Sequence, residues 1–148
     1  MKRLTLILSS LLAAVPVLAF GAEATGVLHI SLTVVASCNV QTQPVAFTPY
    51  VTGGAASSTA TGAIDVRCTS GTPAAVFLDG DRTLEGPGGN RVAYTLRANG
   101  KAWPADQSIP VVGQGRQPVH LELAGSVPGG QQVAIGEYAA NEVVRVVY

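Results

Sequence analysis

Apolar side chains recur at every second position along most of this chain, and that pattern constrains its fold more than any other feature. Successive side chains of a β-strand point to opposite faces, so this alternation is typical of a strand with one buried face. The sequence therefore predicts strands in five segments. Their apolar sets are Leu28, Ile30, Leu32 and Val34; Ile64, Val66 and Cys68; Val92, Tyr94, Leu96 and Ala98; Val119, Leu121 and Leu123; and Val144, Val146 and Tyr148.

Clusters of glycine and proline separate the alternating segments and supply the turns between them. Asn99–Gly100 follows one alternating segment directly, and this dipeptide is the strongest hairpin signal in the chain because both residues tolerate positive φ. The 17 glycines and 9 prolines make long helices costly. After residue 24, no window shows the apolar spacing of a helix. We predict an all-β sandwich of about six or seven strands.

The N-terminus has the pattern of a secretory signal peptide. Lys2 and Arg3 precede an apolar stretch from Leu4 to Phe20, and small residues follow it. The alternative is a membrane anchor, but the stretch is at the short limit for spanning and contains Pro16. We predict a signal peptide over residues 1–24 with cleavage between residues 19 and 24, and export of the mature chain to an oxidising compartment.

Cys38 and Cys68 are the only two cysteines of the chain. Thiol pairs persist as disulfides in oxidising compartments, so predicted export predicts a Cys38–Cys68 disulfide. Such a bond stabilises the fold by about 3.6 kcal/mol in the chain-entropy model. A redox pair or a metal site is the alternative, but there is no Cys-x-x-Cys motif, and His29 and His120 lack ligand spacing.

Charge and motifs exclude several functional classes. Formal net charge is zero and only 12% of residues are charged, which excludes a basic nucleic-acid-binding surface. The segment Gly125–Gly129 lacks the spacing of a Gly-x-Ser-x-Gly nucleophile motif, and no nucleophile–base arrangement is visible. We therefore expect a protein that is not an enzyme, with no cofactor, no metal and no nucleic-acid partner.

The position of the first alternating segment leaves two interpretations open. Residues 25–35 come directly after the predicted cleavage zone and precede the first cysteine. A strand at the very start of the mature chain is free to pair with another molecule. It could equally be the first strand of the chain's own sandwich, and the spacing favours neither.

Four segments together resemble the spore coat protein U domain family, whose secreted members are pilin subunits of archaic chaperone–usher pili. The first is residues 60–73, continuing to Leu78–Asp79, and the resemblance covers nearly all of the mature chain. Glu142 differs, because the family usually has an apolar residue there. The other three segments are Ala36–Ser37–Cys38, Gly125–Gln131, and Gly136–Glu137–Tyr138 with the terminal alternating segment.

The resemblance implies an immunoglobulin-like β-sandwich of the incomplete pilin type, with residues 37–148 as the domain and residues 25–36 as a free N-terminal donor strand. In such pilins a periplasmic chaperone fills a groove beside the C-terminal strand, and the donor strand of another subunit then replaces it. The chain would thus be a structural subunit of a cell-surface pilus serving adhesion or biofilm formation, with other pilins, a chaperone and an outer-membrane usher as partners. The resemblance assigns two sets of residues to roles. The donor strand contains Leu28, Ile30, Leu32 and Val34, and the strand that borders the acceptor groove contains Val144, Val146 and Tyr148.

A different function remains compatible with the residues alone. A self-contained secreted β-sandwich that binds a ligand or a matrix polymer would pair residues 25–35 within its own chain. A sandwich fold by itself does not decide between these functions.

Overall fold

A computed structural model describes residues 21–148 of the chain. Most of the predicted signal peptide lies outside the described residues. The chain divides into two units, residues 1–33 and 34–148. Among residues 21–148, no helix has the length and apolar character needed to cross a membrane.

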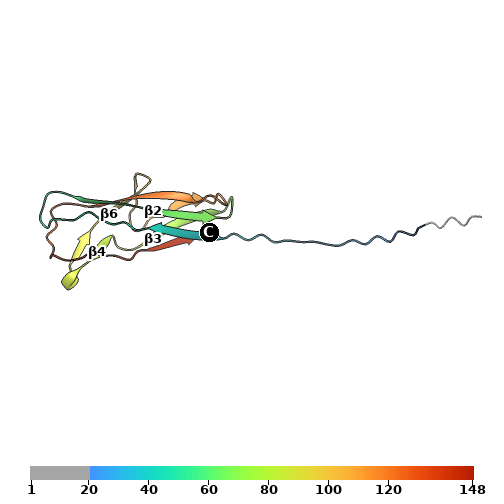
Figure 1. Ribbon diagram of the computed structural model, residues 1–148, viewed down its shortest axis with the longest axis horizontal. Helices are drawn as coiled ribbons and strands as arrows, with labels where there is room; N and C mark the ends of the chain where they lie inside the picture. Colours follow the sequence, from blue (N-terminus) through green and yellow to red (C-terminus); the bar gives the residue numbers. More distant parts are fainter. Residues whose placement is uncertain (1–20) are drawn as a thin grey trace, which may run out of the picture. The chain divides into compact units, whose positions relative to one another are not determined.

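Ten strands and one short 3-10 turn make up the regular structure of residues 34–148 (Figure 1). The strands are β1 (Cys38–Gln43), β2 (Ser58–Cys68), β3 (Pro73–Asp79), β4 (Thr83–Glu85), β5 (Arg91–Ala93), β6 (Thr95–Ala98), β7 (Lys101–Ala102), β8 (Ile109–Val112), β9 (Val119–Val127) and β10 (Val143–Val147), and the turn is η1 (Pro87–Gly89). The prediction of an all-β fold is confirmed. The strand number exceeds the predicted six or seven because several strands are only two to four residues long.

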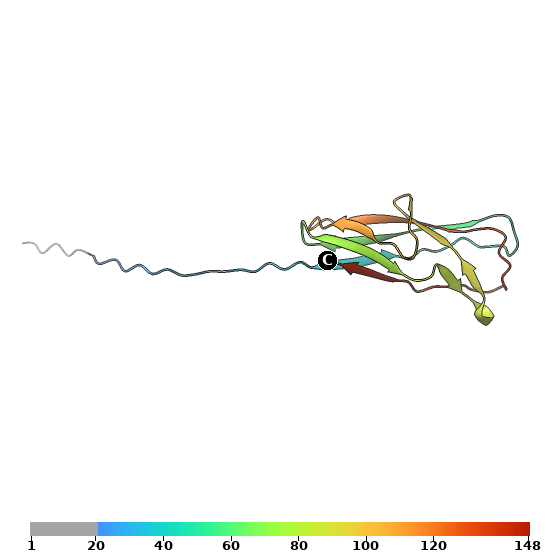
Figure 2. The same ribbon diagram turned by 180° about the vertical axis from the view of Figure 1, so that it is seen from behind.

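Two main sheets form the layers of the sandwich. The larger sheet has the order β1-β2-β9-β6-β7 and the smaller has the order β10-β3-β8, while β4 and β5 form a separate two-stranded sheet. In Figures 1 and 2, β9 (orange) and β10 (red) lie in opposite layers. Every strand pair is antiparallel. Antiparallel sheets keep one face solvated, which accounts for the alternating sequence.

The core lies between the two layers and is built from the alternating residues. Ile64 and Val66 of β2 are each 1% exposed, and Leu121 of β9 is 2% exposed. Trp103 is also buried, and its indole N–H donates to the Gln107 carbonyl oxygen over 2.8 Å. The alternation in β2, β6 and β9 therefore marks the buried face correctly.

The hairpin predicted at Asn99–Gly100 joins β6 to β7. Asn99 and Gly100 both have positive φ, of 48° and 78°, as a two-residue turn between antiparallel strands requires. Ala98 pairs with Lys101 directly across this turn. The prediction is confirmed because the conformation of these two residues is set locally.

The described part of the first unit, residues 21–33, forms neither helix nor strand. Leu28 and Ile30 are each 81% exposed, and Leu32 is 86% exposed. The alternation in this segment predicts a strand with one buried face. Within the described residues, however, the apolar side chains of that face are exposed.

Candidate functional site

An open groove runs along one side of residues 34–148 and reaches into the core. It consists of two hollows of about 680 Å³ and 360 Å³. Residues 42–52 line one wall, and residues 133–144 line the other. The floor includes core side chains of both layers. They are Ile64, Leu78, Leu96 and Leu123 in the smaller hollow, and Val92 and Val127 in the larger.

The two hollows adjoin each other, since they share Val45, Phe47, Leu84 and Ala140 in their linings. The core of a closed sandwich is covered by side chains at native packing density. The floor side chains of the groove are each 7% exposed or less, so the groove borders the core while these side chains stay buried.

Both strands beside the groove have a free edge. Within residues 21–148, β1 pairs only with β2, and β10 pairs only with β3. Thr42 and Gln43 of β1 and Val144 of β10 line the smaller hollow, so both edges border the same opening. An unpaired strand edge presents a row of backbone N–H and C=O groups that can pair with another strand.

Two glycines of the larger sheet lie behind the wall residues of the groove. Gly62 of β2 and Gly125 of β9 lie beneath the wall residues Val45 and Phe47. A Cβ on Gly125 would lie 2.8 Å from the Phe47 ring, and one on Gly62 would lie 2.6 Å from a Val45 methyl group. These glycines therefore let the wall residues pack directly against the sheet. Phe47 also contacts Tyr94 edge to face, with 5.7 Å between ring centroids.

A charged cluster lies at the start of β10. Glu142 accepts hydrogen bonds from the Arg82 guanidinium and from the Tyr94 hydroxyl. The Arg82 and Glu142 side chains are only 9% and 12% exposed. Arg82 also donates to the Leu78 carbonyl oxygen over 3.3 Å. The cluster joins the residue before β10 to the turn after β3 and to the loop between β5 and β6.

The cluster explains why Glu142 differs from the apolar residue that the family usually has. Glu142 precedes the first residue of β10, and its carboxylate turns inward to Arg82, so it occupies no position in the strand. Burial, and next the hydrogen bond to Glu142, raise the pKa of Tyr94 well above its ordinary value of 10.0. Tyr94 therefore stays protonated and donates to the carboxylate across the ordinary pH range.

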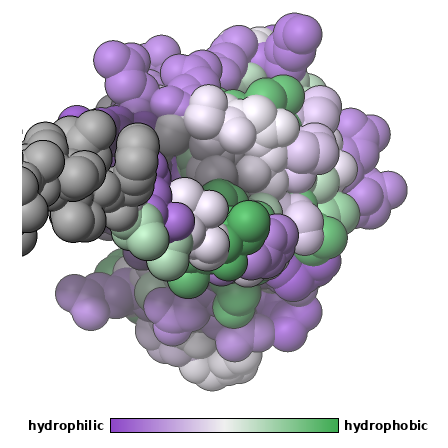
Figure 3. All heavy atoms as spheres, turned by 90° about the vertical axis from the view of Figure 1, so that its right-hand side faces the viewer, coloured by the Kyte–Doolittle hydropathy of each residue, from purple (hydrophilic) through white to green (hydrophobic). Residues whose placement is uncertain are grey.

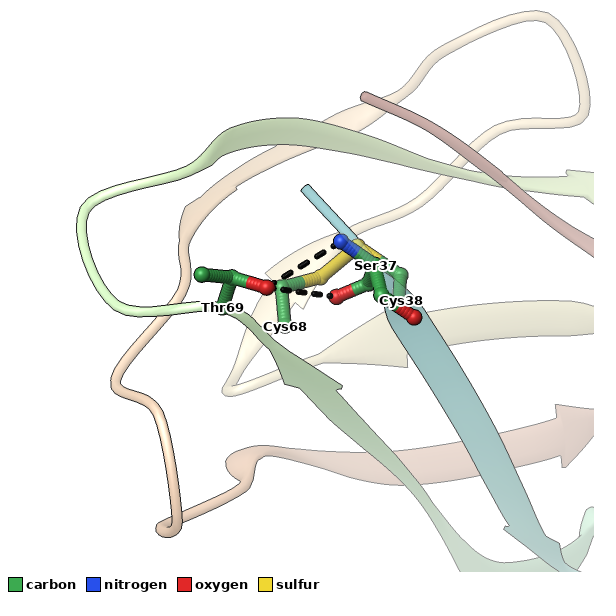
Figure 4. Close-up of a disulfide and its surroundings, with 4 residues drawn as sticks. All are labelled: Ser37, Cys38, Cys68 and Thr69. Carbon is green, nitrogen blue, oxygen red and sulfur yellow. Dashed lines mark hydrogen bonds between the residues drawn. A yellow bond between two sulfur atoms is a disulfide. The ribbon is translucent and has the colours of Figure 1, made fainter. Parts of the chain in front are cut away.

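The predicted disulfide is present between Cys38, the first residue of β1, and Cys68, the last residue of β2. Figure 4 shows how Thr69 reinforces it: the Ser37 backbone N–H donates to Thr69 Oγ1 over 3.1 Å, and Thr69 Oγ1 donates to the Ser37 carbonyl oxygen over 3.4 Å. The start of the sandwich is thus covalently attached to a central strand of the larger sheet.

The sequence-predicted site residues fall into two groups. Leu28, Ile30 and Leu32 belong to the first unit, and Val34, which is 75% exposed, begins the second. Val144 and Val146 lie on the inner face of β10 and pack against the core. Tyr148 follows the end of β10 and is 58% exposed. Of the terminal-strand residues, only Val144 lines the groove.

Most residues that line the groove were not predicted from the sequence. Val45 and Phe47 follow β1 in an irregular segment, and Val133 and Tyr138 precede β10 in another. Neither segment alternates, so periodicity could not find them. The resemblance of Gly136–Glu137–Tyr138 to the family was the one sequence signal that pointed to part of this lining.

No other constellation among residues 21–148 has the character of a reactive site. No group of three or more His, Cys, Asp or Glu side chains in this part of the chain could hold a metal ion. His120 contacts Asp65 over 2.7 Å on the outer face of the larger sheet.

Comparison with known proteins agrees with this geometry. The sequence profile of the Spore Coat Protein U domain matches residues 24–145. The chain belongs to this family. This match confirms the predicted family membership. A search of curated proteins found no match.

A solved structure shows a similar fold. It is a chain of the crystal structure of the CsuC–CsuE chaperone–tip adhesion subunit pre-assembly complex from archaic chaperone–usher Csu pili of Acinetobacter baumannii. It matches with a TM-score of 0.59 and 17% sequence identity, over 78% of this chain and 41% of that chain. The family member described here thus spans less than half of the chain that it matches.

Proposed function

We propose that this Spore Coat Protein U domain protein is a structural subunit of a cell-surface pilus that polymerises by donor-strand complementation. In this proposal the signal peptide directs export to the periplasm, and a chaperone first occupies the groove between β1 and β10. At an outer-membrane usher, residues 25–36 of another subunit replace the chaperone and extend the fibre on the cell surface. Adhesion or biofilm formation would be the role of the assembled pilus.

One observation carries the proposal: the same chain has a groove with two free strand edges and an exposed, alternating apolar segment. A strand over residues 25–35 would be about 35 Å long at about 3.3 Å per residue. Head-to-tail use of two different surfaces does not close on itself, so repeated pairing gives a fibre.

Burial of the donor side chains provides the driving force. Leu28, Ile30, Leu32 and Val34 are at least 75% exposed in this structure. Burying four such side chains at about 1.5–3 kcal/mol each gives roughly 6–12 kcal/mol before ordering costs. Backbone hydrogen bonds to the edges of β1 and β10 add about 0.5–1.5 kcal/mol apiece.

The experiment places a charge on either face of the donor segment. Ile30→Asp and Leu32→Asp should leave the chaperone–subunit complex at its normal level but stop the variant from extending a fibre. Ser31→Asp, which adds the same charge to the opposite face, should polymerise normally. Fibre length measured by electron microscopy checks both expectations. Fibres of normal length from Ile30→Asp and Leu32→Asp would contradict the donor assignment.

The oligomeric state and the protease sensitivity of the purified chain distinguish the pilus subunit from the rival function. A self-contained β-sandwich that binds a ligand or matrix polymer would remain a monomer without a chaperone, with residues 25–35 protected from proteolysis within its own chain. A pilus subunit instead exposes this segment until another subunit's groove receives it.

A further inference from the structure

The exposed apolar segment and the groove that the proposed function assigns to it belong to the same chain. Leu28, Ile30 and Leu32 are each at least 81% exposed, and the side of the sandwich on which the chain ends exposes further hydrophobic residues between hydrophilic ones (Figure 3). A short flexible tether raises the effective concentration of a binding segment to roughly millimolar. Insertion of the segment into its own groove would thus compete with donation to another subunit, and the residues that connect the segment to β1 decide the outcome.

The connection between the apolar segment and β1 is short. Only Ala36 and Ser37 separate Val35 from Cys38, where β1 begins. Parallel strands need a connection of about a dozen residues or more, so a segment that folds back through these two residues must run antiparallel to β1. It would form a β-hairpin with the edge of β1 that borders the groove.

The last residue of the connection is fixed in an extended position. Ser37 continues the β1–β2 ladder by one residue and lies opposite Thr69 (Figure 4). The Thr69 N–H donates to the Ser37 carbonyl oxygen over 2.9 Å, and the Ser37 N–H donates to Thr69 Oγ1 over 3.1 Å. The Cys38–Cys68 disulfide holds this end of the ladder closed. A hairpin turn must therefore lie before Ser37.

A two-residue turn, the commonest hairpin connection, would place the wrong face of the segment inward. With a turn at residues 35–36, Thr33 would lie opposite Cys38, and Ser31 would lie opposite Val40. Residues that are directly opposite share a face of the sheet, and Cys38 and Val40 are the residues of β1 that pack against the core. The two hydroxyl side chains would thus be buried, while the four apolar donor side chains would stay in solvent.

A three-residue turn would bring the apolar face inward, but the sequence does not suit it. With a turn at residues 34–36, Leu32 would lie opposite Cys38. The last residue of such a turn adopts the left-handed conformation and is normally glycine, whereas this chain has Ala36 there, with negative φ. The turn would also remove Val34 from the donor set. A longer turn with an odd number of residues would remove further donor side chains.

We propose that the Ala36–Ser37 connection prevents the apolar segment from completing its own sandwich and so reserves it for the groove of a second copy. A turn with an even number of residues exposes the donor face, and a turn with an odd number lacks a residue suited to the left-handed position. Thr69 and the disulfide keep Ser37 from relieving either conflict. The inference rests on the proposed function and deepens it by giving the reason why the partner is another chain.

Two variants with equally suitable turn sequences test this inference. The odd-turn variant combines Val34→Pro, Val35→Asp and Ala36→Gly, which gives the three-residue turn Pro-Asp-Gly. The even-turn variant combines Val35→Asn and Ala36→Gly, which gives the two-residue turn Asn-Gly. Ser37 and all residues of the groove are the same in both variants and in the wild type.

Each mature chain is diluted until it stays monomeric, and two quantities are measured. They are the affinity for a synthetic peptide of residues 24–36 and the rate at which a protease specific for leucine and isoleucine cleaves residues 25–33. The wild type and the even-turn variant should bind the peptide with affinities within about twofold, because their grooves are empty. The odd-turn variant should bind it at least about tenfold more weakly and be cleaved at least about tenfold more slowly, because its own segment occupies the groove. Slower cleavage distinguishes an occupied groove from an unfolded sandwich.

Each other result overturns the inference. If the odd-turn variant binds the peptide as tightly as the wild type and is cleaved as fast, the connection does not control self-insertion, while the proposed function stays intact. If the even-turn variant also loses peptide binding, the argument from the number of turn residues is wrong. Failure of the peptide to bind the wild type would overturn the proposed function, and the inference with it. A wild-type segment that resists cleavage in the monomer would do the same and would favour the self-contained β-sandwich.

Discussion

β2 and β10 carry the same kind of alternating sequence but differ in burial. Ile64 and Val66 of β2 are 1% exposed, whereas Val144 and Val146 of β10 are only partly buried. β2 pairs with β1 on one side and β9 on the other, but among residues 21–148 β10 pairs with β3 alone. Sequence alternation therefore reports which face of a strand is apolar, whereas the number of neighbouring strands determines how far that face is covered.

The difference also concerns how each strand is held in place. β2 is fixed by two ladders and a disulfide. β10 has one ladder, and the residue that directly precedes it, Glu142, is held by a buried ion pair with Arg82. This short edge strand thus gains order from a charged cluster at its beginning, while its other edge stays unpaired among residues 21–148.

The largest effect should come from removing that cluster. Glu142→Ala leaves Arg82 buried without its counter-charge, and this should lower the free energy of unfolding by about 3–5 kcal/mol. Glu122→Ala, on the exposed face of β9, should change it by less than about 0.5 kcal/mol. Urea unfolding of both variants measures the difference. Equal stability would show that β10 does not depend on Glu142.

Removing the disulfide should have the next largest effect. Cys38→Ser together with Cys68→Ser should lower the free energy of unfolding by about 3 kcal/mol, because the unfolded chain regains the freedom of the closed loop. Subunit levels in the periplasm should fall accordingly. Unchanged thermal stability and abundance would argue against a structural role for this bond.

A matched pair of core truncations compares the two strands directly. Val66→Ala should cost about 2 kcal/mol, and Val146→Ala less than about 1 kcal/mol, because the second side chain is only partly removed from water. Saturation with the peptide of residues 24–36 should bring the two costs closer together. If the difference between the two free-energy costs stays constant when the peptide is bound, then the peptide does not bury the inner face of β10.

The smallest effect concerns alkaline pH. The pKa of Tyr94 is raised in the folded chain, chiefly by burial and then by Glu142, above its ordinary value of 10.0. The stabilisation that follows from this shift is fully present below pH 10.0 and is lost as pH rises through the folded-state pKa. The melting temperature of the wild type should therefore fall as pH rises above 10.0, and the melting temperature of Tyr94→Phe should fall less steeply. An identical decline in both chains would assign the effect to other groups.

Local patterns predicted the parts of the fold whose order is local. Alternation found β2 and β9, and Asn99–Gly100 found the β6–β7 hairpin. The same reasoning missed β1, which has a mainly polar sequence, and β8, which contains Pro110. Their strand conformation depends on ladders to distant residues, which no local period records.

The groove was harder to predict than the strands. Its walls are irregular segments, and the cluster at its edge joins Arg82 to Glu142 across 60 residues of sequence. The sequence resemblance indicated that a groove should exist beside the terminal segment. It did not reveal Val45 and Phe47 as wall residues, or the reason for an acidic residue at position 142.

Under the proposed function, in which the chain is part of a fibre, the disulfide has a mechanical consequence. Tension applied through the N-terminal segment reaches the sandwich at Cys38, where the sulfur bridge transmits it at once to Cys68. The load therefore passes to an interior strand of the larger sheet without first peeling β1 away, one hydrogen bond after another. Without the disulfide, a force on the N-terminal segment would break the hydrogen bonds of the edge strand one at a time. With the disulfide, the force must break the hydrogen bonds of several strand pairs at once, and this requires a larger force.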